Sequence, residues 1–280
     1  MQGGSGVMAG SSDFKHNLIL RSATGTVLVA VLLVFLYFGS WWWHGFAAAV
    51  ALGSLWEYYK MSAGLPKVAE LVGLAAAAVV LLLPLSLSQT GLIAVLGLAC
   101  FLVYFSEVLR RHLTGESRSS QTVGTVMSGL AYAVLPWYIM ICLREFPEIG
   151  FGAVLSVFLC TWSCDVMAYL VGSKCGTRKV CPNVSPGKSG EGFIGGLAAS
   201  VLCGSLCALF FGVRPAAYVL TGLACGTLGQ LGDLAESVIK REKGVKDSGT
   251  IFPGHGGFMD RFDSVLVNAL SAWIVWELLI

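Results

Sequence analysis

The stretch "GLIAVLGLACFLVYF", residues 91–105, contains no charged residue and consists mainly of aliphatic and aromatic side chains. Comparable stretches recur along the chain, such as "VLVAVLLVFLYFG" at 27–39 and "VGLAAAAVVLLLPLSL" at 72–87. Segments of about 20 predominantly apolar residues are typical of membrane-spanning helices. Of the 280 residues, 56% are hydrophobic and 12% charged, whereas soluble domains carry about 25% charged residues. The sequence therefore predicts an all-α, polytopic integral membrane protein.

Nine segments have the length and apolarity of membrane spans. Their expected ranges are 23–39, 41–59, 68–87, 90–109, 122–143, 150–172, 193–213, 216–239 and 258–279. This number can be tested by the positive-inside rule, under which Lys and Arg collect in cytoplasmic loops. With nine spans, all of the 18 Lys and Arg residues fall on one side except Arg144 and Arg214. We therefore expect a cytoplasmic N-terminus and cytoplasmic loops after every second span.

The chain is expected to contain three regions. Residues 1–22 are polar and rich in Gly and Ser, which predicts a flexible cytoplasmic tail. Residues 23–146 form an N-terminal bundle of about five spans, in which Glu57 and Glu107 are expected to be interfacial, with a functional role as the alternative. Residues 150–280 form a C-terminal domain of about four spans with cytoplasmic loops, where the candidate catalytic residues collect. The cysteines form no CxxC pair and have no histidine at zinc-ligand spacing, so neither a zinc site nor a disulfide framework is indicated.

Two features of the C-terminal region point to a polar ligand. Asp165 lies within the apolar "VFLCTWSCDVMAYLVG", residues 157–172, and an ionisable residue at such depth is costly and by default marks a functional site. The loop at 172–196, "GSKCGTRKVCPNVSPGKSGEGFIGG", combines close-approaching glycine backbone with Lys188, which suits phosphate. It is not a P-loop, because the GxxxxG spacing is missing. The competing interpretations are a structural ion pair for Asp165 and an ordinary basic loop.

A polar stripe descends one face of the eighth span. In "GQLGDLAESVIKR", Asp233, Glu236, Ser237 and Lys240 fall at i, i+3, i+4 and i+7. Glu236 and Lys240 fit a surface ion pair at a helix end. Asp233 does not, because it lies between glycine and leucine about 10 Å further down the helix axis.

The loop before the last span is strongly charged. Lys240, Arg241, Lys243 and Lys246 form a cationic run, and "FPGHGG" at 252–257 cannot continue a helix. Asp260 and Asp263 follow in the first turn of the ninth span, and with Asp233 nearby they suggest oxygen ligands for a hard cation such as Mg²⁺. Carboxylates, cations and glycine backbone at a membrane surface indicate phosphoryl or nucleotidyl transfer between a lipid and a soluble nucleotide.

Residues 237–263, "SVIKREKGVKDSGTIFPGHGGFMDRFD", resemble the signature of phosphatidate cytidylyltransferases, the CDP-diacylglycerol synthases. The matching positions are Ser237, Lys240, Arg241, Lys246, Asp247, Pro253, His255, Gly256, Gly257, Asp260, Arg261 and Asp263. The resemblance continues upstream through "GDLAES", "SPGKSGEGFIGG" and "DVMAYLVG", and so covers about residues 160–280. One departure is that the family's Ser-Pro-Lys-Lys-Thr reads Ser-Pro-Gly-Lys-Ser at 185–189.

This resemblance implies an enzyme that condenses CTP with phosphatidic acid to give CDP-diacylglycerol and pyrophosphate. It also implies Mg²⁺ as cofactor, leaving the number of metal ions open, with Asp233 and Asp260 as first ligands and Asp165 and Asp263 next. The implied catalytic residues are Asp233, Asp260, Lys240, Arg261 and His255. The implied nucleotide or phosphate contacts are Ser185, Lys188, Lys240, Arg241, Lys246, Gly256 and Gly257.

Two other functions fit part of this pattern. A CTP-dependent kinase of polyprenol or phytol would transfer the γ-phosphate and release CDP. A transporter would use Asp165 and Asp233 as ion sites, although no internal repeat of the kind common in transporters is visible. The expected partners are CTP, phosphatidic acid and the lipid bilayer; nothing indicates a nucleic acid, and a homodimer is compatible with the sequence. The compact length resembles the bacterial form, which predicts a multi-pass protein of the plasma membrane.

Overall fold

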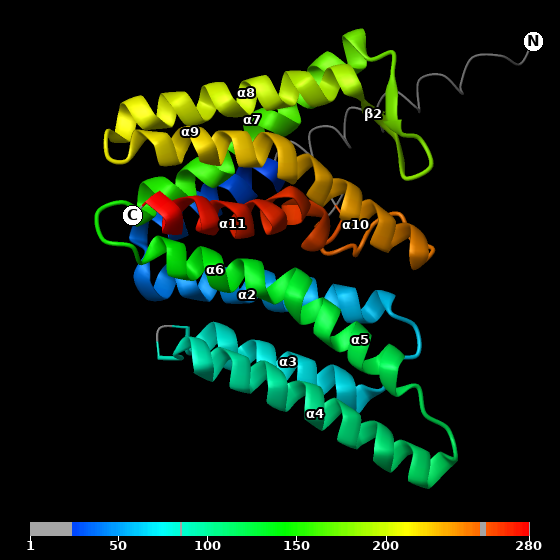
Figure 1. Ribbon diagram of the computed structural model, residues 1–280. Coiled ribbons are helices and arrows are strands. Elements are labelled where there is room, and N and C mark those ends of the chain that lie inside the picture. Colours follow the sequence, from blue (N-terminus) through cyan, green and yellow to red (C-terminus); the bar gives the residue numbers. More distant parts are fainter. Residues whose placement is uncertain (1–23, 85, 253–255, 280) are drawn as a thin grey trace, which may run out of the picture.

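The computed structural model describes residues 24–84, 86–252 and 256–279, and most of them are helical (Figure 1). A first helical segment spans Thr24–Phe38. The remaining elements are α2 (Ser40–Met61), α3 (Lys67–Leu82), α4 (Gln89–Thr114), α5 (Ser119–Gly129), the π-helical turn η1 (Leu130–Val134), α6 (Leu135–Arg144), α7 (Gly150–Cys175), β1 (Lys179–Cys181), β2 (Ser185–Ser189), α8 (Gly190–Phe211), α9 (Pro215–Ala224), the π-helical turn η2 (Cys225–Gly229), α10 (Gln230–Glu242) and α11 (Met259–Leu279).

Every predicted span coincides with a helical segment of the described residues, when α5, η1 and α6 are taken as one segment and α9, η2 and α10 as another. Among the described residues, five segments are long and apolar enough to cross a membrane. They are Gln89–Thr114, Ser119–Arg144, Gly150–Cys175, Gly190–Phe211 and Met259–Leu279. The chain is thus a multi-pass membrane protein with a nearly all-α fold.

The segment between α7 and α8 differs from the loop predicted at 172–196. It contains an antiparallel hairpin in which Lys179 pairs with Ser189 and Cys181 with Ser185. The helix α8 also begins earlier than the predicted span, at Gly190, because the Ser189 hydroxyl accepts a hydrogen bond from the Gly192 amide at 3.2 Å. A serine cap of this kind satisfies an amide that the helix itself leaves unpaired.

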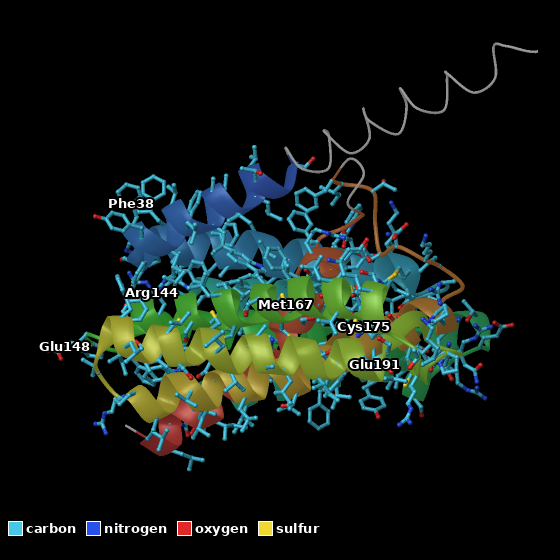
Figure 2. All side chains as sticks on the ribbon, turned by 90° about the horizontal axis from the view of Figure 1, so that it is seen from above. Phe38, Arg144, Glu148, Met167, Cys175 and Glu191 are labelled. Atoms are coloured by element: carbon cyan, nitrogen blue, oxygen red, sulfur yellow. The ribbon has the colours of Figure 1, made fainter. Side chains whose placement is uncertain are left out.

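The helices lie roughly alongside one another, with α7, α8 and α9 on one side of the molecule and the α3–α4 hairpin on the other (Figure 1). The α2–α3 and α4–α5 connections, the β hairpin and the end of α10 share one end of the bundle, here called the loop end. Figure 2 shows Cys175 and Glu191 toward this end, Arg144 and Glu148 at the opposite end, and Met167 between them. The α6–α7 and α8–α9 connections lie at that opposite end.

Close backbone contacts join α8 to α9. A Cβ atom at Gly204 would lie 2.5 Å from the Tyr218 carbonyl oxygen, and one at Gly222 would lie 2.5 Å from that of Ser200. The Ser200 hydroxyl also donates to the Gly222 carbonyl at 2.8 Å. Without a strong hydrophobic force between helices inside a bilayer, small residues and such hydrogen bonds hold spans together. The strand β2 of the hairpin packs against α8 of this pair and against α7.

Aromatic side chains connect the N-terminal helices to α11. Trp137 of α6 is buried and contacts Phe262 of α11 edge-to-face, with ring centroids 5.0 Å apart. Trp43 of α2 lies against Trp137 and donates its indole N–H to the Met140 carbonyl at 3.1 Å. The start of α11, where the charged loop ends, is therefore fixed against the first half of the chain.

Candidate functional site

The β hairpin carries Lys188 over the start of α10. Lys188 Nζ lies 2.8 Å from Asp233 Oδ2 and donates to the Gln230 carbonyl oxygen at 2.9 Å. The side chains of this cavity pair, Lys188 and Asp233, are 24% and 35% exposed. An ion pair that is this open gains little from mutual attraction, so either partner can be transferred to a charged ligand at small cost.

Backbone and side-chain hydrogen bonds fix the hairpin that presents Lys188. The Glu191 carboxylate in the first turn of α8 accepts from the amides of Thr177 and Arg178, the former at 3.1 Å. The Gly190 amide donates to the Arg178 carbonyl at 2.8 Å. The loop predicted at 172–196 is therefore held by hydrogen bonds to the start of α8, and these bonds position Lys188.

A cavity of about 550 Å³ opens beside the cavity pair. Its lining comes from α7, the hairpin, the first turn of α8 and α10: Asp165, Ala168, Tyr169, Gly172, Ser173, Gly176, Lys179, Val180, Ser185, Gly187, Lys188, Ser189, Gly192, Phe193, Gln230, Asp233 and Leu234. Sites for small molecules and cofactors typically measure about 300–1,000 Å³. The structure thus brings the predicted residues Asp165, Ser185, Lys188 and Asp233 to one cavity of a size that suits a nucleotide.

Gln230 forms part of the cavity floor and was not anticipated from the sequence. Its side-chain amide donates to the Phe193 carbonyl at 3.1 Å and to the Gly226 carbonyl at 2.7 Å. The second bond is possible because the π-helical turn η2 widens the helix there, and such turns often occur at functional sites. Gln230 thereby ties α10 to α8 and leaves its own carbonyl for Lys188.

Lys240 and Asp260 form a second ion pair, the loop pair, with Nζ and Oδ1 2.8 Å apart. Their side chains are only 13% and 5% exposed. Asp260 Oδ2 also accepts from the Ser248 amide at 2.8 Å and the Gly257 amide at 2.8 Å, and lies 2.9 Å from the Ser248 hydroxyl. Both oxygens of the Asp260 carboxylate, which was predicted to bind metal, therefore accept hydrogen bonds from the protein itself.

The glycines around Asp260 allow this arrangement. Gly256 has φ of +83°, a left-handed conformation that favours glycine, and a Cβ atom there would lie 2.5 Å from Asp260 Oδ2. The Gly256 carbonyl accepts from the Phe252 amide at 2.9 Å. Gly256 and Gly257, predicted as phosphate contacts, thus let the backbone of the loop approach the Asp260 carboxylate closely in this structure.

Glu236 is fully buried, so its interpretation as half of a surface pair was wrong. It lies 3.4 Å from Lys240, as the i,i+4 spacing predicts, but α10 turns this face toward α11 rather than toward solvent. Asp263 of α11 is half-buried, and its Oδ1 accepts from the Ser264 amide at 2.6 Å. Neither residue is part of the lining of the cavity.

The other predicted cations lie at the surface of the loop end. Arg241, Lys246 and Arg261 are exposed, and Arg241 donates to the Val245 carbonyl at 3.3 Å. They are free to attract a polyanion but do not line the cavity. His255 and Pro253 lie outside the described residues.

The predicted metal ligands fall into different surroundings. Asp165 and Asp233 line the same cavity, whereas Asp260 belongs to the loop pair. Within residues 24–84, 86–252 and 256–279, no group of three or more His, Cys, Asp or Glu side chains is placed to hold a metal ion. A site made by protein ligands alone is therefore not formed by the described residues.

Two glutamates expected at the membrane interface are instead buried. Glu57 of α2 is 1% exposed and accepts hydrogen bonds from the amides of Phe258 (2.9 Å) and Met259 (3.1 Å) and from the Ser248 hydroxyl (2.8 Å). Glu107 of α4 is 2% exposed and accepts from the Arg118 amide at 2.8 Å at the start of α5. Nothing in the local sequence around either glutamate indicates these contacts.

Comparison with known proteins identifies the family of the chain. A model of the cytidylyltransferase family matches residues 19–279. A phosphatidate cytidylyltransferase of Mycobacterium bovis is 32% identical over 281 residues, which cover 95% of this chain and 89% of the relative. One of Mycobacterium tuberculosis is 32% identical over 95% of this chain and 83% of its own length. One of Staphylococcus aureus is 46% identical over 119 residues, or 42% of this chain and 46% of the relative.

Proposed function

Because the chain belongs to the cytidylyltransferase family, we propose that it is a phosphatidate cytidylyltransferase acting on CTP and phosphatidic acid. A phosphate oxygen of the lipid forms a bond to the α-phosphorus of CTP. The bond from that phosphorus to the oxygen bridging toward the β-phosphate breaks, and pyrophosphate leaves with the electron pair. The products are CDP-diacylglycerol and pyrophosphate.

The observation that carries this proposal is the cavity pair. A lysine and an aspartate, both partly exposed, face each other in the wall of a nucleotide-sized cavity in a multi-pass membrane protein. When a triphosphate enters, Lys188 can leave Asp233 for a phosphate oxygen, because both contacts are charge-assisted and the lysine stem is flexible. Charge stabilisation and positioning are the main tasks of a protein in such transfers.

The surroundings of the cavity suit one soluble and one lipid substrate. Arg241, Lys246 and Arg261 at the loop end would attract the triphosphate from solution. Val166, Tyr169 and Leu170 of α7 are exposed apolar residues close in sequence to Asp165, and Tyr169 also lines the cavity. Their exposure suits contact with acyl chains, which would leave the lipid phosphate near the polar lining.

Asp165 and Asp233 are the residues we assign to Mg²⁺. Their carboxylates line one cavity, and Mg²⁺ commonly takes one or two carboxylates together with substrate phosphates and water. Asp263 of α11 is the further candidate ligand, whereas Asp260 is assigned to the loop pair because its oxygens already have protein donors. When bound, Mg²⁺ would neutralise phosphate oxygens and so make the α-phosphorus easier to attack.

The topology supports the same proposal. We assign nine spans, a cytoplasmic N-terminus and a cytoplasmic loop end, since nearly all Lys and Arg residues then lie on the cytoplasmic side. The cavity would open where CTP is available and beside the leaflet that contains the lipid. The relatives named above are bacterial, which supports the plasma membrane as location.

The reaction can be tested with purified protein in detergent, CTP labelled at the α-phosphate, phosphatidic acid and Mg²⁺. We expect label in a lipid product, release of pyrophosphate, and loss of both when Mg²⁺ is chelated, with recovery on its return. Label that appears only in soluble CDP, with a prenol as acceptor, would contradict the proposal in favour of a kinase. A folded protein that turns over no CTP with either lipid would contradict it outright.

A further inference from the structure

Glu57 connects the N-terminal bundle to the charged loop over a very long sequence distance. It lies in α2, yet among the described residues its hydrogen-bond donors are Ser248, Phe258 and Met259, around 200 residues further along the chain. Two of these donors are amides at the start of α11, where a helix leaves its N–H groups unpaired. Burying a carboxylate to 1% exposure would be costly without such partners. The fold therefore depends on these hydrogen bonds to Glu57.

The backbone of the loop is shaped to admit Glu57. A Cβ atom at Gly257 would overlap both Glu57 carboxylate oxygens, and one at Gly249 would lie 2.5 Å from Oε1. One turn earlier on α2, a Cβ atom at Gly53 would lie 2.6 Å from the Phe258 ring. Gly53 thus forms a notch for Phe258 next to the carboxylate that holds its amide.

Contacts lead from Glu57 to the loop pair. The Ser248 hydroxyl lies 2.8 Å from Glu57 Oε2 and 2.9 Å from Asp260 Oδ2, and the Ser248 amide donates to Asp260 at 2.8 Å. Asp260 in turn holds Lys240. A single serine is therefore shared by the carboxylate of the first bundle and that of the signature segment.

We propose that Glu57 is a positioning residue of the active site, which holds residues 248–252 and 256–260 so that Asp260 and Lys240 keep the geometry needed for turnover. This inference rests on the proposed function. It gives the N-terminal bundle a direct part in the reaction, although Glu57 touches neither the cavity nor a substrate. The proposal requires the loop to loosen, and turnover to fall, when the Glu57 charge is removed without loss of side-chain volume.

The test compares Glu57→Gln with Glu107→Gln, a matched control because Glu107 is equally buried and also holds the start of a helix. In Glu57→Gln we expect kcat to fall about 10- to 100-fold, because a small displacement of positioned groups by a change far from the chemistry can cost that much. The KM for CTP should stay within about threefold, because the cavity lining is unchanged. Amides of Ser248, Gly257, Phe258 and Met259 should exchange hydrogen faster, whereas the Glu107→Gln protein should change in neither kcat nor exchange at these amides.

Adding Ser248→Ala to Glu57→Gln should lower kcat little further if Glu57 acts through Ser248. Wild-type turnover in Glu57→Gln, or equal losses of turnover and of loop protection in the two glutamine variants, would overturn the proposal. If the wild-type protein makes no CDP-diacylglycerol, the proposed function fails. The exchange measurement then still decides whether Glu57 holds the loop.

Discussion

Two lysine–aspartate pairs in this protein have the same 2.8 Å separation and opposite surroundings. The cavity pair, Lys188 and Asp233, is partly exposed and its lysine has one further contact, to a backbone carbonyl. The loop pair, Lys240 and Asp260, is nearly buried, and its aspartate accepts from two amides besides the lysine. Exposure and the number of additional donors, rather than the distance, separate a pair that can bind a ligand from one that holds the chain.

This difference changes which signature residues we connect with chemistry. Asp260 and Gly257 belong to the longest matching segment of the sequence, yet their contacts in the structure are with each other, Ser248 and Lys240. Asp165 and Lys188, which come from shorter matches, lie in the cavity with Asp233. We infer that the signature segment supports the site and that the cavity pair carries the reactants.

Asp260→Asn should have the largest effect, and it should be on stability. The change removes the closer of two carboxylates from the nearly buried Lys240 and leaves it, among the described residues, only Glu236 at 3.4 Å. Breaking a buried pair typically costs about 3 to 5 kcal/mol of stability. Thermal unfolding in detergent should show a large drop, whereas Asp233→Asn should lose about 1 kcal/mol or less because that pair is partly exposed. Equal stability losses in the two variants would show that the surroundings of the pairs do not matter.

Asp233→Asn should have the larger effect on the reaction among variants that stay fully folded. We expect kcat/KM for CTP to fall about 10²- to 10³-fold, the usual loss when a preorganised electrostatic group is removed from an active site. The measurement is the rate of lipid labelling at saturating phosphatidic acid, with melting temperature as the control. A loss below threefold would remove Asp233 from the site.

Lys188→Arg keeps the charge of the cavity pair and changes its geometry. The guanidinium is larger than the ammonium and presents its donors in a rigid planar fork instead of at one compact charge, so we expect a loss of about tenfold in kcat/KM. Lys188→Met should lose more than Lys188→Arg in the same assay. If the two variants were equally active, the lysine would be a contact of the hairpin only.

Lys246→Gln should have the smallest effect. This exposed residue is outside both pairs, and a surface cation near a membrane contributes about 1 kcal/mol of attraction. We expect kcat/KM to fall about fivefold at low ionic strength and to match the wild type at high salt, where screening removes the attraction. A loss that persists at high salt would place Lys246 in direct contact with substrate.

The positions of the helices could be predicted from the sequence because membrane spans need long apolar segments. Their orientation, which the charge alternation predicts, stays a prediction. The hairpin at 179–189 could not be predicted, since its strands are only three and five residues long and hydrogen bonds to Glu191 and Gly190 at the start of α8 hold the chain beside them. Its two strands also sit within a segment whose glycines and prolines are typical of an irregular loop.

For the site, single residues were predictable but their contacts were not. Asp165 and Asp233 stood out because charge within an apolar span is costly. Glu236 did not, because an i,i+4 partner is as common on a surface as in an interior. Glu57 acquires its contacts only when α2 packs beside the start of α11. Gln230 acquires its contact with the Gly226 carbonyl only when η2 forms. No local sequence pattern indicates either arrangement.

The most direct test of the account is CTP binding by two matched variants, Lys188→Met and Lys240→Met, measured by equilibrium dialysis on protein that elutes as a folded species. The cavity pair predicts that Lys188→Met loses CTP binding while Lys240→Met retains it. Wild-type affinity in Lys188→Met, together with lost binding in Lys240→Met, would contradict the account and move the nucleotide to the signature loop.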